Sequence, residues 1–241
     1  SDYGKYILYT GAVDPRKNLF NLIKAYSLLP KILILKHRLV LTGPFSKIEI
    51  ELIHSWIDNC NLSMHDINIL GYVSDIELAN LYRNCYLFVF PSIHEGFGLP
   101  VLEAMSCGAP VIASNCTSIP EILQLQDALF NPYDIHQIKD KIIHVCTDNT
   151  FYNLLKSYSN SRKFDFAWDI TASKTISAMH EILSMYKLNS ITHKTVFSKK
   201  NKNKDNYKQL LKNLKNSPFI KSLNPSYLRR ISSSIDLLNF Q

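Results

Sequence analysis

The sequence contains few of the residues that build covalent or metal-held frameworks. Its five cysteines are odd in number and far apart, and none belongs to a Cys-x-x-Cys pair. This spacing predicts neither a disulfide framework nor a zinc site, and it favours buried free thiols. The cysteines are Cys60, Cys85, Cys107, Cys116 and Cys146.

Long hydrophobic runs are missing as well. No apolar run approaches the roughly 20 residues that a membrane-spanning helix needs. The first residues contain neither a basic n-region nor an apolar h-region of a secretory signal. We therefore expect a cytoplasmic location, with peripheral contact at the inner membrane face as an option that depends on the basic tail.

Residues 1–187 have almost no excess of either charge, although the net charge of all 241 residues is +7. Residues 188–241 hold eleven Lys or Arg and only two acids, which gives this tail a charge of +9. Residues 1–187 hold 16 basic and 18 acidic side chains, so their balance is −2. We expect one α/β domain at 1–187, and a basic linker with short helical segments at 188–241.

Apolar runs alternate with helical patterns along residues 1–187. Apolar spacing of three to four residues predicts helices at 18–29, 47–59, 75–84, 100–107 and 168–186. Short apolar runs predict strands at 6–9, 38–41, 67–70, 87–90, 111–113 and 128–130. This alternation is typical of a doubly wound parallel sheet, in which ligands bind beyond the carboxyl ends of the strands.

The stretch from Glu95 to Glu103 places two carboxylates eight positions apart, directly after the buried strand predicted at 87–90. Gly96 and Gly98 permit a close backbone approach, and Pro100 suits the first turn of a helix, where its missing N–H costs nothing. A helix that begins in this way offers unpaired N–H groups and a positive dipole end to a phosphate.

This stretch resembles the E-x7-E signature of the retaining glycosyltransferases of family 4. The resemblance extends from about Lys5 to Lys187, and residues 95–110 (EGFGLPVLEAMSCGAP) match most specifically. Residues 14–18 (DPRKN), 71–75 (GYVSD), 90–92 (FPS) and 111–115 (VIASN) also match. The resemblance implies the donor-binding, C-terminal half of a GT-B fold, mannosyltransferase-like, with transfer from a GDP- or UDP-hexose.

The resemblance assigns the diphosphate to Lys17, which we count as catalytic, with Arg16 beside it as a fork-shaped phosphate partner. The alternative is an exposed Arg-Lys pair that is merely solvated. At the end of the first strand this chain has Gly11-Ala12-Val13, where many family members have an arginine, and we count Gly11 among the donor-binding residues. Phosphate neutralisation would then depend on Lys17, on loop amides, and on Arg16 or Lys47.

The two motif carboxylates receive different roles from the resemblance. Glu95 would contact the donor sugar near its reacting carbon, and Glu103 would accept hydrogen bonds from the ribose hydroxyls. We expect Glu103 in the first turn of its helix, where the alternative role is dipole stabilisation of about 0.3–1 kcal/mol. Gly96, Phe97, Gly98 and Leu99 would supply backbone contacts, with a core position as the alternative for Leu99.

Two further positions match the base pocket of the family. Val73 would pack against the base, and Asp75 would make a polar contact with it. A helix-terminal acid is the alternative for Asp75, because Ser74 and Glu77 match the pattern of a capping box.

An Asp-x-Asp triad is absent from the sequence. Acids in that arrangement hold Mn²⁺ or Mg²⁺ in metal-dependent transferases, so we expect no metal and no cofactor besides the nucleotide sugar. The expected partners are the donor, a glycan or lipid-linked acceptor, and an N-terminal GT-B domain. The chain begins near the first strand, so we expect it to be a piece of a larger protein that transfers sugar poorly alone.

Two other functions stay open from the residues. A glycoside hydrolase would use Glu95 and Glu103 as acid and nucleophile, with their carboxyl groups about 5–9.5 Å apart. A non-catalytic scaffold would use its basic tail on a membrane surface, where the amphipathic segments 207–214 and 227–238 follow the charged residues 199–204. Tyr207 is the one aromatic among residues 199–215, so we expect no nucleic-acid partner.

Overall fold

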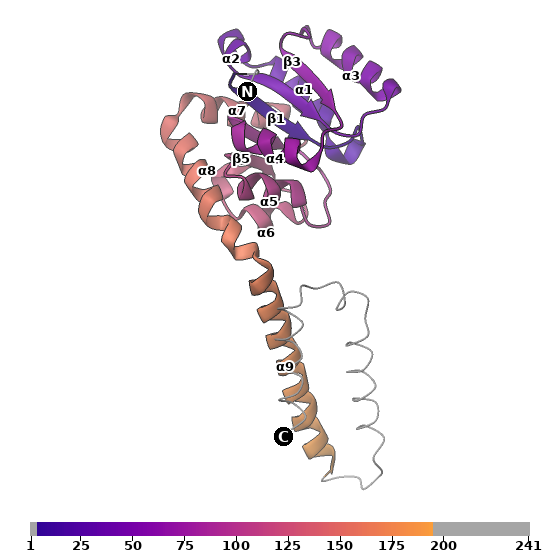
Figure 1. Ribbon diagram of the computed structural model, residues 1–241, viewed down its shortest axis with the longest axis vertical. Helices are drawn as coiled ribbons and strands as arrows, with labels where there is room; N and C mark the ends of the chain where they lie inside the picture. The colour runs from indigo at the N-terminus through magenta and orange to yellow at the C-terminus, as the bar shows by residue number, and fades with distance from the viewer. Residues whose placement is uncertain (1–3, 195–241) are drawn as a thin grey trace. The chain divides into compact units, whose positions relative to one another are not determined.

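The computed structural model describes the backbone of residues 4–194 and the side chains of residues 4–182 (Figure 1). The strands are β1 (Tyr6–Thr10), β2 (Arg38–Thr42), β3 (Ile67–Gly71), β4 (Leu87–Phe90), β5 (Val111–Ser114) and β6 (Leu129–Phe130). The longer helices are α1 (Leu19–Ser27), α3 (Lys47–Asn59), α4 (Asp75–Asn84), α5 (Leu99–Ser106), α7 (Ile135–Thr147), α8 (Asn149–Arg162) and α9 (Trp168–Lys194). The short ones are η1 (Pro15–Lys17), α2 (Lys31–Lys36), α6 (Ile119–Leu123), η2 (Gln126–Ala128) and η3 (Lys163–Phe166).

The six strands form one parallel sheet in the order β3-β2-β1-β4-β5-β6. All residues of β4 and β5 are buried, as expected for strands that are covered on both faces. The predicted α/β fold class, a doubly wound parallel sheet, is confirmed, and each predicted strand is present.

Neighbouring strands β1 and β4 mark the point where the strand order reverses. The chain proceeds from β1 to β2 and β3 on one side, and then crosses to β4, β5 and β6 on the other. Right-handed crossovers in opposite directions place their helices on opposite faces of the sheet. Accordingly, α1 contacts α3 and α7, whereas α5 contacts α4, α6 and α8. Ligands of doubly wound sheets bind at the carboxyl edge where the strand order reverses, which here lies between the loops after β1 and β4.

Local signals explain where several helices begin. Ser74 caps α4 in a capping box with Glu77, as the sequence predicts, and Ser46 and Glu49 form a second capping box at α3. Pro100 lies at the start of α5, also as predicted, because its missing N–H needs no partner there.

The amino end of the sheet contains a buried group of polar side chains. The Tyr26 hydroxyl lies 3.0 Å from the carbonyl oxygens of both His37 and Asp66. His37 is only 4% exposed, and its ring packs against Tyr86 with their centroids 4.3 Å apart. Within the described residues, His37 Nδ1 has no hydrogen-bond partner. Burial lowers the pKa of His37 to about 4, and Lys5 and Lys36 add to this effect.

The chain divides into two compact units, Ser1–Phe166 and Ala167–Gln241. The long last helix, predicted at 168–186, is present as α9 in the second unit. The predicted domain boundary after residue 187 stays a prediction. The charged residues 199–204 and the amphipathic segments 207–214 and 227–238 lie outside the described residues.

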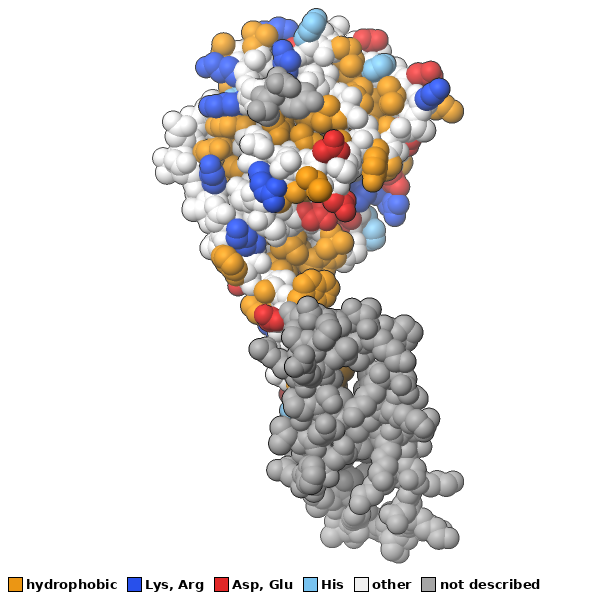
Figure 2. Space-filling model, in the orientation of Figure 1, with side chains coloured by type: hydrophobic (Ala, Val, Ile, Leu, Met, Phe, Trp, Pro, Cys, Tyr) orange, Lys and Arg blue, Asp and Glu red, His pale blue; other side chains and the backbone are white. Residues whose placement is uncertain are grey.

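Charges on the visible face of the first unit are mixed. Figure 2 shows lysine, arginine, aspartate and glutamate side chains interspersed with exposed hydrophobic ones on that face. This agrees with the near-neutral balance of residues 1–187 in the sequence. In the part of the chain that the structure describes, no helix combines the length and apolarity needed to cross a bilayer.

Candidate functional site

Lys17 lies in the loop that follows β1, at the end of the short helix η1. The Asp14 carboxylate caps η1 by accepting from the Arg16 N–H. Asn18 then adopts a left-handed φ of 58°, and its buried side-chain amide donates to the carbonyl oxygens of Pro91 and Pro132. Asn18 thus ties the loop after β1 to the chain that follows β4 and β6, and this fixes the place of Lys17.

Lys17 meets Glu95 across the point where the strand order reverses. The Lys17 Nζ atom lies 2.6 Å from Glu95 Oε1, and the two side chains are 26% and 12% exposed. Ser92, which is fully buried, donates a hydrogen bond of 2.7 Å to the same oxygen. Within the described residues the second oxygen, Oε2, has no partner, so it is available to accept a ligand hydroxyl. The structure therefore brings the two predicted catalytic residues together.

Arg16 is already paired with its neighbour. Its guanidinium forms a fork on both oxygens of Asp14, with Nη2 2.7 Å from Oδ2, and its side chain is 66% exposed. The hydrogen bonds from Arg16 lower the pKa of Asp14 to about 2. The Arg16 carbonyl oxygen accepts from the Ile93 N–H and lies 2.9 Å from the Ser92 hydroxyl oxygen, so the backbone of Arg16 supports the loop after β4.

The glycine loop between Glu95 and α5 leaves several backbone donors unused. Gly98 has a φ of +102°, which side chains of L-residues rarely adopt, and it caps α5 without a side-chain hydrogen bond. A Cβ atom added to Gly96 would meet no other atom within 4 Å, so open space surrounds this residue. In the described part of the chain, the N–H groups of residues 96–99 have no acceptor. Four consecutive free amides beside an ammonium group are suited to bind an anion.

Two side chains of this loop face solvent rather than the core. Leu99 is 57% exposed, so its alternative interpretation as a core leucine is wrong, because it occupies the first position of α5 on the solvent side. Phe97 is 44% exposed and packs edge-on against Phe166, with the ring centroids 6.1 Å apart.

Glu103 is the fifth residue of α5, which begins at Leu99. The expectation of a first-turn position is therefore wrong, since a turn contains 3.6 residues. Its Oε2 atom accepts a hydrogen bond of 3.2 Å from the Tyr82 hydroxyl of α4. Burial raises the pKa of Tyr82, and the nearby Glu103 carboxylate raises it further, whereas Thr10 at the end of β1 lowers it. Because Glu103 lies beyond the first turn of α5, helix-dipole stabilisation does not explain it.

Gly11 follows β1 directly, where it approaches the end of β2. A Cβ atom on Gly43 would collide with the Gly11 carbonyl oxygen, so this close approach requires a glycine at position 43. Under Gly11 lies the Tyr9 ring, whose hydroxyl donates to the Ala12 carbonyl oxygen. Burial raises the pKa of Tyr9, and the Glu95 and Asp14 carboxylates raise it further.

Val73 and Asp75 flank Ser74 at the start of α4, beyond the carboxyl end of β3. Val73 is partly buried against the core, and Asp75 lies in the first turn of α4. Both interpretations of Asp75, a base contact and a helix-terminal acid, fit this position. The base-pocket roles of the two residues stay predictions.

Four residues that hold this site were not predicted from the sequence: Asn18, Ser92, Thr117 and Ser118. Asn18 and Ser92 lie inside the matching strings 14–18 and 90–92, but neither residue was assigned a role there. Thr117 and Ser118 follow β5, and the Glu95 backbone bonds to both side chains. Their place after a strand end was the available signal.

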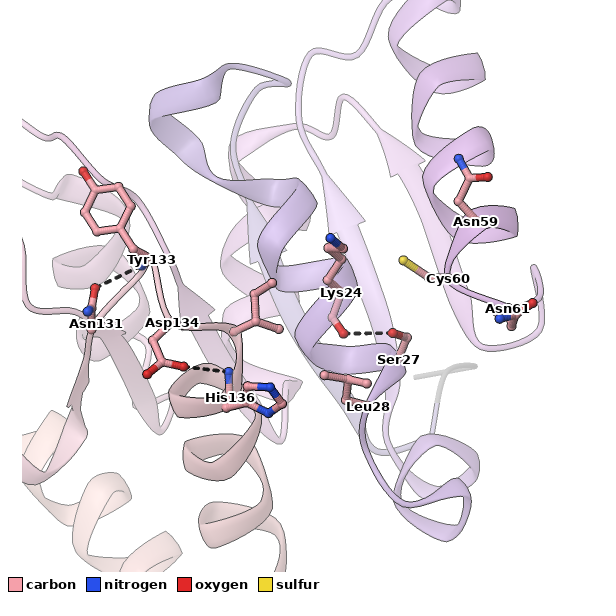
Figure 3. A pocket seen from close by; sticks show the side chains of 11 residues that line it. Lys24, Ser27, Leu28, Asn59, Cys60, Asn61, Asn131, Tyr133, Asp134 and His136 are labelled. Carbon is pink, nitrogen blue, oxygen red and sulfur yellow. Dashed lines mark hydrogen bonds between the residues drawn. The ribbon is translucent and has the colours of Figure 1, made fainter.

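A separate hollow of about 850 Å³ lies on α1, away from Lys17 and Glu95. Figure 3 shows Lys24 and Ser27 of α1, with Leu28 directly after it, between the end of α3 and the turn before α7. This hollow contains none of the predicted site residues. It supplies matched positions for control variants.

Comparison with known proteins gives consistent matches. The profile of the family described as "Glycosyl transferases group 1" matches residues 2–163. The "Serotype-specific mannosyltransferase WbdA" of Escherichia coli is 40% identical over 179 residues, which cover 74% of this chain and 22% of that protein. The "O-antigen chain mannosyltransferase B" of Escherichia coli is 36% identical over 180 residues, 72% of this chain and 45% of that protein. The chain thus spans about a fifth to a half of the length of these relatives.

Solved structures show the same fold. A sucrose-phosphate synthase from Thermosynechococcus elongatus superposes with a TM-score of 0.65 at 25% identity, covering 76% of this chain and 46% of that chain. Anabaena HepE in complex with UDP and glucose superposes with a TM-score of 0.62 at 21% identity, covering 76% and 49%. The sheet and its flanking helices match these GT-B glycosyltransferases.

Proposed function

The chain belongs to the group 1 glycosyltransferases, and from this membership we propose that its carboxyl edge binds the nucleotide-diphosphate sugar of a retaining hexosyl transfer. The donor would be a GDP- or UDP-hexose, and the mannosyltransferase relatives favour mannose. The HepE structure was solved with UDP and glucose, which supports a nucleotide sugar as the ligand class.

The contact between Lys17 and Glu95 carries this proposal. It joins the loops after β1 and β4 at the reversal of strand order, where ligands of doubly wound sheets bind. Lys17 uses one direction of its ammonium group on Glu95 and retains donors for a phosphate oxygen. The free amides of residues 96–99 lie in the loop that follows Glu95. Together they would neutralise the charge that develops on the leaving diphosphate, which is a large contribution to catalysis.

The carboxylates would divide the rest of the donor between them. Glu95 Oε2 would accept a sugar hydroxyl, and Glu103 would accept from the ribose while Tyr82 holds its other side. Val73 and Asp75 would line the base. Retention would follow if the departing phosphate itself takes the acceptor proton on the same face of the sugar.

The acceptor and the protein domain that holds it are the further partners in this reaction. We infer that a glycan or lipid-linked acceptor is held by an N-terminal GT-B domain, so that this chain alone binds donor but transfers sugar poorly. Independence from metal, a cytoplasmic location and contact of the basic tail with the inner membrane face belong to the same proposal. Equal donor affinity in Mg²⁺ and in EDTA would support the first of these.

A calorimetric titration of the full chain with GDP, UDP, GDP-mannose and UDP-glucose tests the proposal. We expect saturable heat for one base, and its loss in Lys17→Ala and in Glu103→Ala. Lys24→Ala is the matched control, because Lys24 is an exposed lysine in the hollow on α1 and should leave binding unchanged. If wild-type protein gives no heat with any of the four ligands, the proposed function is wrong.

A further inference from the structure

The backbone of Glu95 is held at both of its polar groups by the loop that follows β5. The Glu95 N–H donates a hydrogen bond of 3.1 Å to Thr117 Oγ1, and the Ser118 hydroxyl donates one of 3.1 Å to the Glu95 carbonyl oxygen. Just before them, the buried Ser114 hydroxyl donates to the Ser92 carbonyl oxygen. Three contacts therefore fasten the loop after β4 to the end of β5 and to the loop that follows it.

Thr117 adopts an unfavourable backbone conformation to make its contact. Its φ is +51°, in the left-handed region. For a β-branched residue this conformation is a genuine outlier, and such strain persists where the surrounding structure demands it. A glycine would occupy this position without strain, but it would provide no acceptor for the Glu95 N–H.

Ser118 also gives up its usual local role. It is the N-cap residue of α6, the position where a serine oxygen normally accepts from the helix N–H groups. Here the side chain makes no capping hydrogen bond, and its hydroxyl bonds to the Glu95 carbonyl oxygen instead. Thr117 and Ser118 thus both forgo a favourable local state to bond to the backbone of one residue, Glu95.

We propose that Thr117 and Ser118 are positioning residues, which set the place of the Glu95 carboxylate against the donor sugar. This inference rests on the proposed function, because it assigns Glu95 to the sugar. Lys17 and Ser92 hold the Glu95 carboxylate, and the loop after β5 holds its backbone. With both ends held, Glu95 Oε2 is the carboxylate oxygen left to meet a hydroxyl group, and the binding site is pre-organised.

Thr117→Gly separates this role from a merely structural one. We expect it to weaken binding of the sugar nucleotide about three- to tenfold, while the affinity for the matching nucleoside diphosphate stays within about twofold. Its melting temperature should not fall, because glycine relieves the strained backbone. Thr117→Ser retains the acceptor oxygen and should bind both ligands as wild type does. Ser118→Ala should repeat the selective loss.

Hydrogen exchange of the Glu95 amide, followed by NMR, tests the contact without a ligand. We expect a protected amide in wild type and in Thr117→Ser, and faster exchange in Thr117→Gly. Unchanged exchange, or equal loss of diphosphate and sugar-nucleotide affinity, would overturn the inference. If wild-type protein binds no nucleotide but the exchange result holds, the proposed function fails while the contact itself stands.

Discussion

At the amino end of the sheet, buried polar side chains contact backbone carbonyl oxygens and aromatic rings of the core. At the carboxyl end, polar side chains instead bond to one another in loops that reach the surface. Tyr26 and His37 represent the first end, and Lys17, Ser92 and Glu95 represent the second. Within the described residues, Thr117 on the carboxyl side is the one β-branched residue with a left-handed φ. Strained and incompletely bonded groups are typical of binding sites. We therefore expect changes at the carboxyl end to alter binding, and changes at the amino end to alter stability.

Lys17→Met should produce the largest effect. Loss of a charge-assisted hydrogen bond to phosphate, about 1.5–3 kcal/mol, should weaken nucleotide binding by about 10- to 100-fold. The free energy of unfolding should change by less than about 1 kcal/mol, because Ser92 still bonds to Glu95. Calorimetry and urea unfolding measure the two quantities. A Lys17→Met protein with a lower free energy of unfolding but unchanged nucleotide affinity would contradict the assignment of binding to the carboxyl end.

His37 should dominate the loss of stability in acid. Its folded pKa of about 4 lies below the ordinary 6.5, so the unfolded chain takes up the proton first as pH falls. The stabilisation contributed by neutral His37 is fully present above pH 6.5 and is lost as pH falls to about 4. Between pH 7 and 4.5 the loss should be about 2.5 kcal/mol at most.

Urea unfolding at these two pH values measures that loss. His37→Phe, which retains a ring against Tyr86, should abolish this component. His136→Gln, at an exposed position on α7, should retain the wild-type dependence on pH. If the free energy of unfolding falls equally between these two pH values in wild type and in His37→Phe, the amino end is not the acid-sensitive end.

Tyr26→Phe should lower stability by about 2 kcal/mol. The substitution removes a buried hydroxyl and leaves the carbonyl oxygens of His37 and Asp66 without that donor. Nucleotide affinity should stay within about twofold, because these groups lie at the amino end. Thermal unfolding and calorimetry on the same sample would reveal a binding loss that contradicts the comparison.

Gly98→Ala and Gly96→Ala distinguish a glycine required by the backbone conformation from a glycine required by the ligand. We expect them to have the smallest effects on stability. The φ of +102° at Gly98 should make alanine cost about 1 kcal/mol of stability. Gly96 lies in open space without a left-handed φ, so alanine should leave stability unchanged. If Gly96 is needed for close approach of the donor, only sugar-nucleotide affinity should fall there. Unchanged affinity in Gly96→Ala would restrict the donor contacts to residues 97–99.

Much of the fold follows from local patterns that the sequence displays. A short apolar run marks every strand, and the pair Ser74 and Glu77 marks the start of α4, because both signals involve neighbouring residues. Position within a helix was harder to predict. Glu103 falls beyond the first turn because α5 begins at Leu99, one residue before the proline that marks it.

The residue types of the candidate site are determined by the sequence, since the family strings around Lys17 and Glu95 can be read from it directly. Their partnership depends on the strand order. Lys17 and Glu95 are 78 positions apart and meet because β1 and β4 are neighbours where the order reverses. The bonds from Thr117 and Ser118 to Glu95 likewise need β5 beside β4. Local chemistry sets the elements, whereas only long-range packing of the sheet decides which loops meet.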